Sequence, residues 1–142
     1  MRPFIALTIA ASLLLPLEAA AKWPQPAAGE SVSGNPEIIF TFDDGPDHRF
    51  TPRGLKLLRE RNIQAIFYWV GHRIDQRKKH ADLRRAVATR AQLEGHVIGT
   101  HTINHVHLCS LPAGEGAAEI DGAIREYGAL TGLPMILFRA PY

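Results

Sequence analysis

The chain has 142 residues, of which 46% are hydrophobic and 21% are charged, and its formal net charge at pH 7 is +2. This length allows one domain, and so small a charge gives no support for binding to nucleic acid or to an acidic membrane surface. Cys109 is the only cysteine, so no disulfide can form within the chain. We interpret Cys109 as a small buried hydrophobic residue, with metal ligation or nucleophilic chemistry as alternatives.

The first 21 residues have the pattern of a secretory signal peptide. A basic start at residues 1–3 precedes an apolar run at 4–17 and a small-residue cleavage site at 19–21. The run is shorter than the roughly 20 residues that a membrane-spanning helix needs. We therefore predict cleavage after Ala21, no stable membrane insertion, and export to the periplasm or out of the cell; an uncleaved anchor is the alternative. Residues 22–36, rich in Pro, Ala, Gly and Ser, are expected to be a linker, and residues 37–142 the domain.

Short apolar runs alternate with amphipathic segments through this domain. The runs predict strands at residues 37–42, 65–70, 96–99 and 135–138, the first of them buried, and helices near 51–62, 79–93 and 117–130. Thr51 is expected to cap the first helix and Pro52 to occupy its first position. The residues expected to face the core from the first two helices are Leu55, Leu57, Leu58, Leu83, Ala86, Val87 and Ala91. The alternating order is typical of an α/β fold with a parallel sheet and crossover helices.

Polar side chains follow three of the four predicted strands. Asp43 and Asp44 follow the first; two adjacent carboxylates repel, so they need a cation or a shared proton. His101 and His105 follow the third strand, and on a helical turn their spacing would place both rings on one side. Arg139 follows the fourth strand. Because the C-terminal ends of parallel strands share one edge of the sheet, we expect these side chains to converge there.

Two histidines and one carboxylate are a suitable ligand set for Zn²⁺ or a similar divalent ion, with positions left for water and substrate. The second aspartate is then free to act as a base toward a water that the metal makes acidic. The pattern indicates a metal-dependent hydrolase. The remaining histidines are interpreted as surface or supporting residues: His48, His72, His80, His96 and His107.

Three segments carry a more specific signal: Thr-Phe-Asp-Asp-Gly-Pro at residues 41–46, His-Thr-Ile-Asn-His at 101–105, and Arg-Ala-Pro-Tyr at 139–142. In this order they resemble the motifs of polysaccharide deacetylases of the NodB homology type, carbohydrate esterase family 4. The resemblance covers residues 37–142 and implies a distorted (β/α) barrel. Because this family has two further motifs downstream of the third, we expect the chain to supply the N-terminal part of such a barrel, truncated at its C-terminus.

The resemblance also implies a role for each matching residue. Asp43 would be the general base, Arg139 would orient it, and Tyr142 would donate its backbone N–H to the developing oxyanion. The ion, Zn²⁺ with Co²⁺ or Ni²⁺ as alternatives, would be held by three ligands: Asp44, His101 and His105.

The function that follows is removal of N-acetyl groups from a glucosamine-containing polysaccharide such as chitin oligomers or peptidoglycan, with a metal-activated water as nucleophile. Two alternatives remain open. One is a catalytically silent remnant that binds metal or carbohydrate at most. The other is an esterase for O-acetyl groups of the xylan type, whose leaving group needs less protonation than an amine. The sequence gives no indication of oligomeric state.

Overall fold

The computed structural model describes residues 38–133 and 135–142, so the predicted signal peptide and linker lie outside the described residues. In chain order the elements are β1 (Phe40–Asp43), α1 (Thr51–Glu60), β2 (Ala65–Trp69), the 3₁₀ turn η1 (Gly71–Ile74), α2 (Ala81–Leu93), β3 (Val97–Thr100), the 3₁₀ turn η2 (Leu108–Ser110) and α3 (Glu115–Thr131). Within the part of the chain described, no helix has both the length and the apolar character needed to span a membrane.

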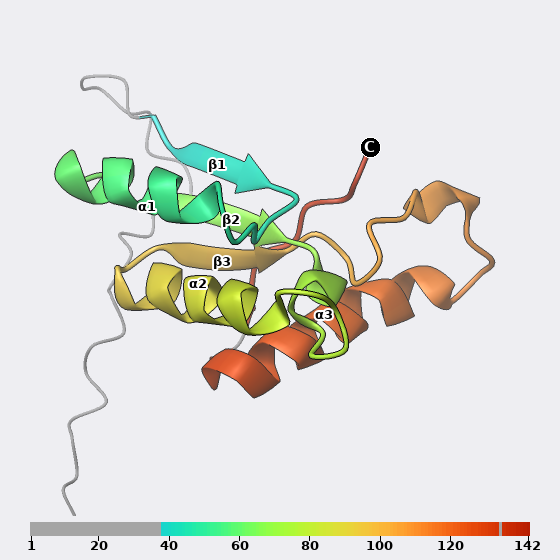
Figure 1. The fold of residues 1–142 in the computed structure, drawn as a ribbon. Helices are drawn as coiled ribbons and strands as arrows, with labels where there is room; N and C mark the ends of the chain where they lie inside the picture. Colours follow the sequence, from blue (N-terminus) through green and yellow to red (C-terminus); the bar gives the residue numbers. More distant parts are fainter. Residues whose placement is uncertain (1–37, 134) are drawn as a thin grey trace, which may run out of the picture. The chain divides into compact units, whose positions relative to one another are not determined.

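The three strands form a parallel sheet in the order β1-β2-β3, which confirms the predicted fold class. In register, Asp43 at the end of β1 lies beside Tyr68 of β2, and Tyr68 lies beside Gly99 of β3. Right-handed crossovers that advance in the same direction place their helices on the same face, and Figure 1 shows α1 and α2 running along the sheet in this way. Side chains alternate between faces along a strand, so Asp43 and Tyr68 belong to the face opposite to these helices.

An apolar core joins the sheet to its helices. Phe67 and Trp69 of β2 form its centre, with aromatic ring centroids 5.1 Å apart. Helices α1, α2 and α3 contribute six further members: Leu55, Leu58, Val87, Ala88, Ala91 and Tyr127. The remaining three are Ala65 of β2, Ile74 of η1 and Met135. Burial of a large apolar side chain contributes roughly 1.5–3 kcal/mol, so this cluster holds the elements together without a disulfide.

Two predictions about the strands are wrong. The first strand is not buried: all four residues of β1 are exposed, with Phe40 at 47% and Phe42 at 40%. Over the described residues β1 pairs only with β2, which makes it an edge strand. The fourth strand is reduced to one parallel bridge between Phe138 and Thr100. The Thr100 N–H donates to the Leu137 carbonyl at 2.8 Å, and this contact keeps the segment beside β3.

The helices also depart from prediction in detail. Thr51 is the first residue of α1 rather than its cap, and its Oγ1 accepts from the Asp47 N–H at 2.9 Å. The Asp47 carboxylate accepts from the N–H groups of Arg49 and Phe50, so Asp47 stabilises the turn before the helix. Three residues predicted to be in the core are exposed: Leu57, Leu83 and Ala86. Because a helix turns once every 3.6 residues, adjacent residues point in different directions. The buried face of α1 contains Leu55 and Leu58, and that of α2 contains Ala81, Val87, Ala88 and Ala91.

His96 lies in the core, just before β3 and at the opposite end of that strand from His101. It is only 6% exposed, and its Nδ1 accepts a hydrogen bond from the Ala65 N–H at 3.2 Å. Burial lowers the pKa of His96 below its ordinary value. His96 is buried and lies away from the site, so its interpretation as a surface or supporting residue is wrong. Nothing local in the sequence indicated its contact with β2.

We expect the chain to lose stability as the pH falls below about 6.5, the pKa of histidine in an unfolded chain. The pKa of His96 is lower in the folded state, so the stability that the neutral ring contributes is present above the unfolded pKa and is lost as the pH falls toward the folded one. Melting temperatures at about pH 7.5 and about pH 5, on either side of that value, measured with a chelator present, test this. His96→Asn keeps an acceptor for Ala65 without titrating, so it should show a smaller acid loss. An equal loss in both proteins would contradict the prediction.

Candidate metal centre

Three segments far apart in the sequence meet at the C-terminal edge of the sheet. Asp43 ends β1 and Asp44 follows it, while His101 follows β3. Arg139 follows the bridge at Phe138, and its N–H donates to the Thr100 carbonyl at 3.0 Å. The structure thus brings together the side chains that the strand ends were predicted to carry.

Asp44, His101 and His105 form a compact cluster of potential metal ligands. One ligand atom from each lies within 4.8 Å of the others. Asp44 Oδ1 is 2.9 Å from His105 Nε2 and 3.4 Å from His101 Nε2. Donor atoms arranged tetrahedrally around Zn²⁺ are separated by roughly 3.3 Å when the bonds are about 2.0–2.1 Å long. The two carboxylate–imidazole separations lie on either side of this value and are compatible with a divalent ion of this size.

The hydrogen bond on the far side of His101 fixes which ring nitrogen is free. His101 Nδ1 lies 2.8 Å from the Arg139 carbonyl oxygen, which can only accept, so Nδ1 carries the hydrogen. In the neutral ring the Nε2 lone pair then faces the Asp44 carboxylate. A lone pair and a carboxylate that face each other repel, and a proton or a cation between them would remove this repulsion. In metal sites, a ligating histidine commonly donates its other ring N–H to a backbone carbonyl.

The cluster is open on one side. The His101 side chain is 5% exposed and that of His105 is 28% exposed, but the Asp44 side chain is 63% exposed. The two rings thus close the inner side of the site, and the carboxylate faces solvent. An ion held here would keep positions for water and for a substrate atom.

The loop that carries the two histidines is not a helical turn, so that part of the prediction is wrong. Thr102 and His105 both have left-handed backbone conformations, with φ of 67° and 57°. The His105 N–H donates to Thr102 Oγ1 at 3.0 Å across the loop. The two rings therefore approach each other through an irregular loop, with centroids 5.1 Å apart, and not through the regular spacing of a helix.

Asp43 lies beside the cluster, and its carboxylate is paired with the guanidinium of Arg139. One terminal nitrogen of Arg139, Nη1, donates to Asp43 Oδ1 at 2.9 Å and to Thr41 Oγ1 at 3.0 Å. The guanidinium also lies over the Tyr68 ring, 4.2 Å from its centroid. Asp43 is not a member of the ligand cluster, so the two adjacent aspartates have different surroundings. The sequence indicated no role for Thr41 or Tyr68 at the site, although strand alternation places both on the same face as Asp43.

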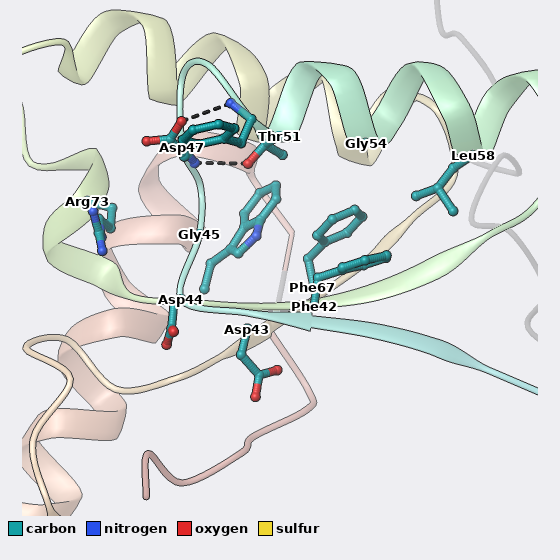
Figure 2. A pocket seen from close by; sticks show the side chains of 12 residues that line it. Phe42, Asp43, Asp44, Gly45, Asp47, Thr51, Gly54, Leu58, Phe67 and Arg73 are labelled. Carbon is teal, nitrogen blue, oxygen red and sulfur yellow. Dashed lines mark hydrogen bonds between the residues drawn. The ribbon is translucent and has the colours of Figure 1, made fainter.

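A cavity of about 390 Å³ lies next to this site but on the other side of β1. Its lining includes the apolar side chains of Phe42, Leu58, Phe67 and Trp69. Figure 2 shows Phe42, Leu58 and Phe67 on the α1 side of the strands, whereas the carboxylates of Asp43 and Asp44 point away from them. The candidate centre is therefore the opposite face, although both aspartates border the cavity.

Three residues considered in the sequence analysis lie at the edge of the candidate metal centre or outside it: Tyr142, His107 and Cys109. The Tyr142 ring is near His105 and His107, with centroid distances of 5.1 and 5.9 Å, and the residue is 84% exposed. Cys109 is exposed in the turn η2, which contains no buried residue, so its interpretation as a buried hydrophobic residue is wrong. Cys109 is also absent from the ligand cluster.

Comparisons with known proteins identify the family of this chain. The profile of the family described as polysaccharide deacetylase matches residues 31–142. A peptidoglycan-N-acetylglucosamine deacetylase of Bacillus cereus is 34% identical over 106 residues, which cover 75% of this chain and 36% of the relative. A chitooligosaccharide deacetylase of Azorhizobium caulinodans is 31% identical over 116 residues, which cover 81% of this chain and 52% of the relative. The chain thus spans between a third and about half of the length of these relatives.

Solved structures show the same fold. The crystal structure of a peptidoglycan N-acetylglucosamine deacetylase in complex with a naphthyl N-hydroxybenzamide superposes with a TM-score of 0.66 at 33% identity, covering 75% of this chain and 46% of that one. The peptidoglycan deacetylase PdaC of Bacillus subtilis gives a TM-score of 0.65 at 27% identity, covering 73% and 48%. With the family profile matching most of its length, the chain belongs to the polysaccharide deacetylase family.

Proposed function

We propose that this chain is part of an exported, metal-dependent hydrolase that removes N-acetyl groups from a glucosamine-containing polysaccharide. The single observation that carries the proposal is the cluster of Asp44, His101 and His105 beside the Asp43–Arg139 pair. The relatives named for peptidoglycan and for chitooligosaccharides support the substrate class, an N-acetylated sugar polymer. The predicted signal peptide supports export.

The donor set of the cluster favours Zn²⁺, with Co²⁺ and Ni²⁺ as alternatives, because two imidazoles and one carboxylate suit these ions. When bound, such an ion would make a coordinated water acidic near neutral pH and would polarise the substrate carbonyl. The rings of His101 and His105 would hold the ion from the buried side, and Asp44 would hold it from the exposed side. The Arg139 carbonyl keeps the His101 ring in the tautomer that leaves Nε2 free.

Asp43 is proposed as the general base that takes a proton from the attacking water at its carboxylate. Arg139 holds that carboxylate in place and balances its charge through the hydrogen bond to Oδ1. Stacking of the guanidinium on Tyr68 limits the positions that Arg139 can take. The backbone N–H of Tyr142 is proposed as a donor to the oxyanion that develops on the substrate.

Acetate release from an N-acetylated chitin oligomer and from peptidoglycan tests this proposal. We expect release that stops with a chelator and returns when Zn²⁺ is added. Ion binding without release from either polymer would favour the catalytically silent alternative. Release from acetylated xylan alone would favour the O-acetyl esterase.

A further inference from the structure

Glu119 of α3 makes hydrogen bonds to the loop between the two histidines. The Ile103 N–H donates to the Glu119 carbonyl at 2.8 Å. The Glu119 carboxylate accepts from the Asn104 N–H at 2.9 Å and from Asn104 Nδ2 at 2.7 Å. Main chain and side chain of Glu119 thus make three hydrogen bonds to the two residues between Thr102 and His105.

The same loop is held on its other side by η1. The Gly71 N–H donates to the Thr102 carbonyl at 3.0 Å, and the His72 N–H donates to the Ile103 carbonyl at 2.8 Å. The Ile103 side chain fits between two glycines: an added Cβ would lie 3.0 Å from it at Gly122 and 3.2 Å from it at Gly71. Close packing of this kind leaves the loop little freedom to shift sideways.

These contacts matter because the loop has an unfavourable backbone. Thr102 has a φ of 67° and is β-branched, a combination that is rare in proteins, and His105 has a φ of 57°. Such conformations persist only where the surroundings determine them. The contacts of Glu119 lie between these two residues, where they can maintain both conformations and hence the distance between the two imidazoles.

We propose that Glu119 is a positioning residue for the divalent ion, which it affects by holding residues 103 and 104 so that His101 and His105 face Asp44. The proposal rests on the proposed metal-dependent function. Glu119 is not a ligand and is not a member of the cluster. Its effect is through geometry, so an uncharged side chain of the same shape should replace it: Glu119→Gln can accept from the Asn104 N–H, and the Asn104 amide can turn to accept from the new amide.

Zinc affinity of the chain, measured by calorimetry with a competing chelator, tests the proposal independently of activity. We expect Glu119→Ala to weaken Zn²⁺ binding about 10-fold, the lower end of the range for residues that support metal ligands. Glu119→Gln should restore affinity to within about threefold, the effect of one hydrogen bond. Asp121→Ala is the matched control, because Asp121 is exposed on the same helix and the described residues give its side chain no hydrogen bond or ion pair.

Unchanged Zn²⁺ affinity in a folded Glu119→Ala protein overturns the proposal. A Glu119→Gln protein that binds Zn²⁺ as weakly as Glu119→Ala also overturns it, because the charge of Glu119 would then be the cause. If Glu119→Ala does not fold, Asn104→Ala removes one of the same hydrogen bonds from an exposed position and should weaken binding about threefold; no change there overturns the proposal. If the parent chain binds no Zn²⁺, the proposed metal-dependent function fails as well. If the parent and Glu119→Ala bind Zn²⁺ equally well, only the proposed role of Glu119 fails.

Discussion

Replacing Asp43 by Asn is expected to lower the rate of acetate release by about 10²–10⁴-fold, the usual contribution of a general base. The amide has nearly the same shape, so the contacts of Arg139 with Thr41 and Tyr68 can remain. It cannot, however, take a proton from water. Affinity for Zn²⁺ should change little, because Asp43 lies outside the ligand cluster. Steady-state kinetics and zinc titration of the same protein preparation measure both effects.

Asp44→Asn is the matched comparison, since it makes the same chemical change at the next residue. We expect it to weaken Zn²⁺ binding as well as activity, because Asp44 Oδ1 faces both imidazoles. If Asp43→Asn loses the ion and Asp44→Asn keeps it, the assigned roles are reversed.

His101→Ala is expected to reduce Zn²⁺ affinity by more than about 100-fold, since removal of residues that merely support a ligand already costs 10–100-fold. The change removes one of three ligands and leaves the Arg139 carbonyl without its donor. It also leaves a cavity, because the His101 side chain is 5% exposed. Zinc titration, together with the visible spectrum of the Co²⁺-loaded protein, checks the loss of ligation.

His107→Ala is the control for this change. His107 is exposed, lies two residues from His105 and is absent from the ligand cluster, so its removal should leave Zn²⁺ affinity unaltered. Loss of the ion in His107→Ala, with retention in His101→Ala, would mean that the ligand set is wrong.

The positions that could be predicted from the sequence are those fixed by strand order. Asp43, His101 and Arg139 each follow a short apolar run, and a parallel sheet brings such ends to one edge whatever the intervening helices contain. The convergence of these side chains could therefore be predicted without knowledge of long-range contacts. The prediction of four strands was less successful, because an apolar run such as 135–138 does not indicate how many hydrogen bonds it makes.

The features that the sequence did not indicate depend on contacts between distant residues or on rare backbone conformations. The left-handed backbone of Thr102 carries no local signal, because β-branched residues disfavour it. The burial of His96 and the contact of Glu119 with Asn104 arise only when α3 and β2 are in place. Exposure of Phe42 follows from the position of β1 at the sheet edge, which periodicity alone cannot reveal.

Arg139 links the two halves of the centre, since its side chain contacts Asp43 and its carbonyl contacts His101. A displacement of this one residue changes the orientation of the carboxylate and of the imidazole at once. Substitutions that shift the segment around Arg139 should therefore alter proton transfer and ion affinity in concert. Combined with Asp43→Asn or His101→Ala, they should give losses smaller than the sum of the separate effects, so thermodynamic cycles through Arg139 can measure how strongly base and ligand are coupled.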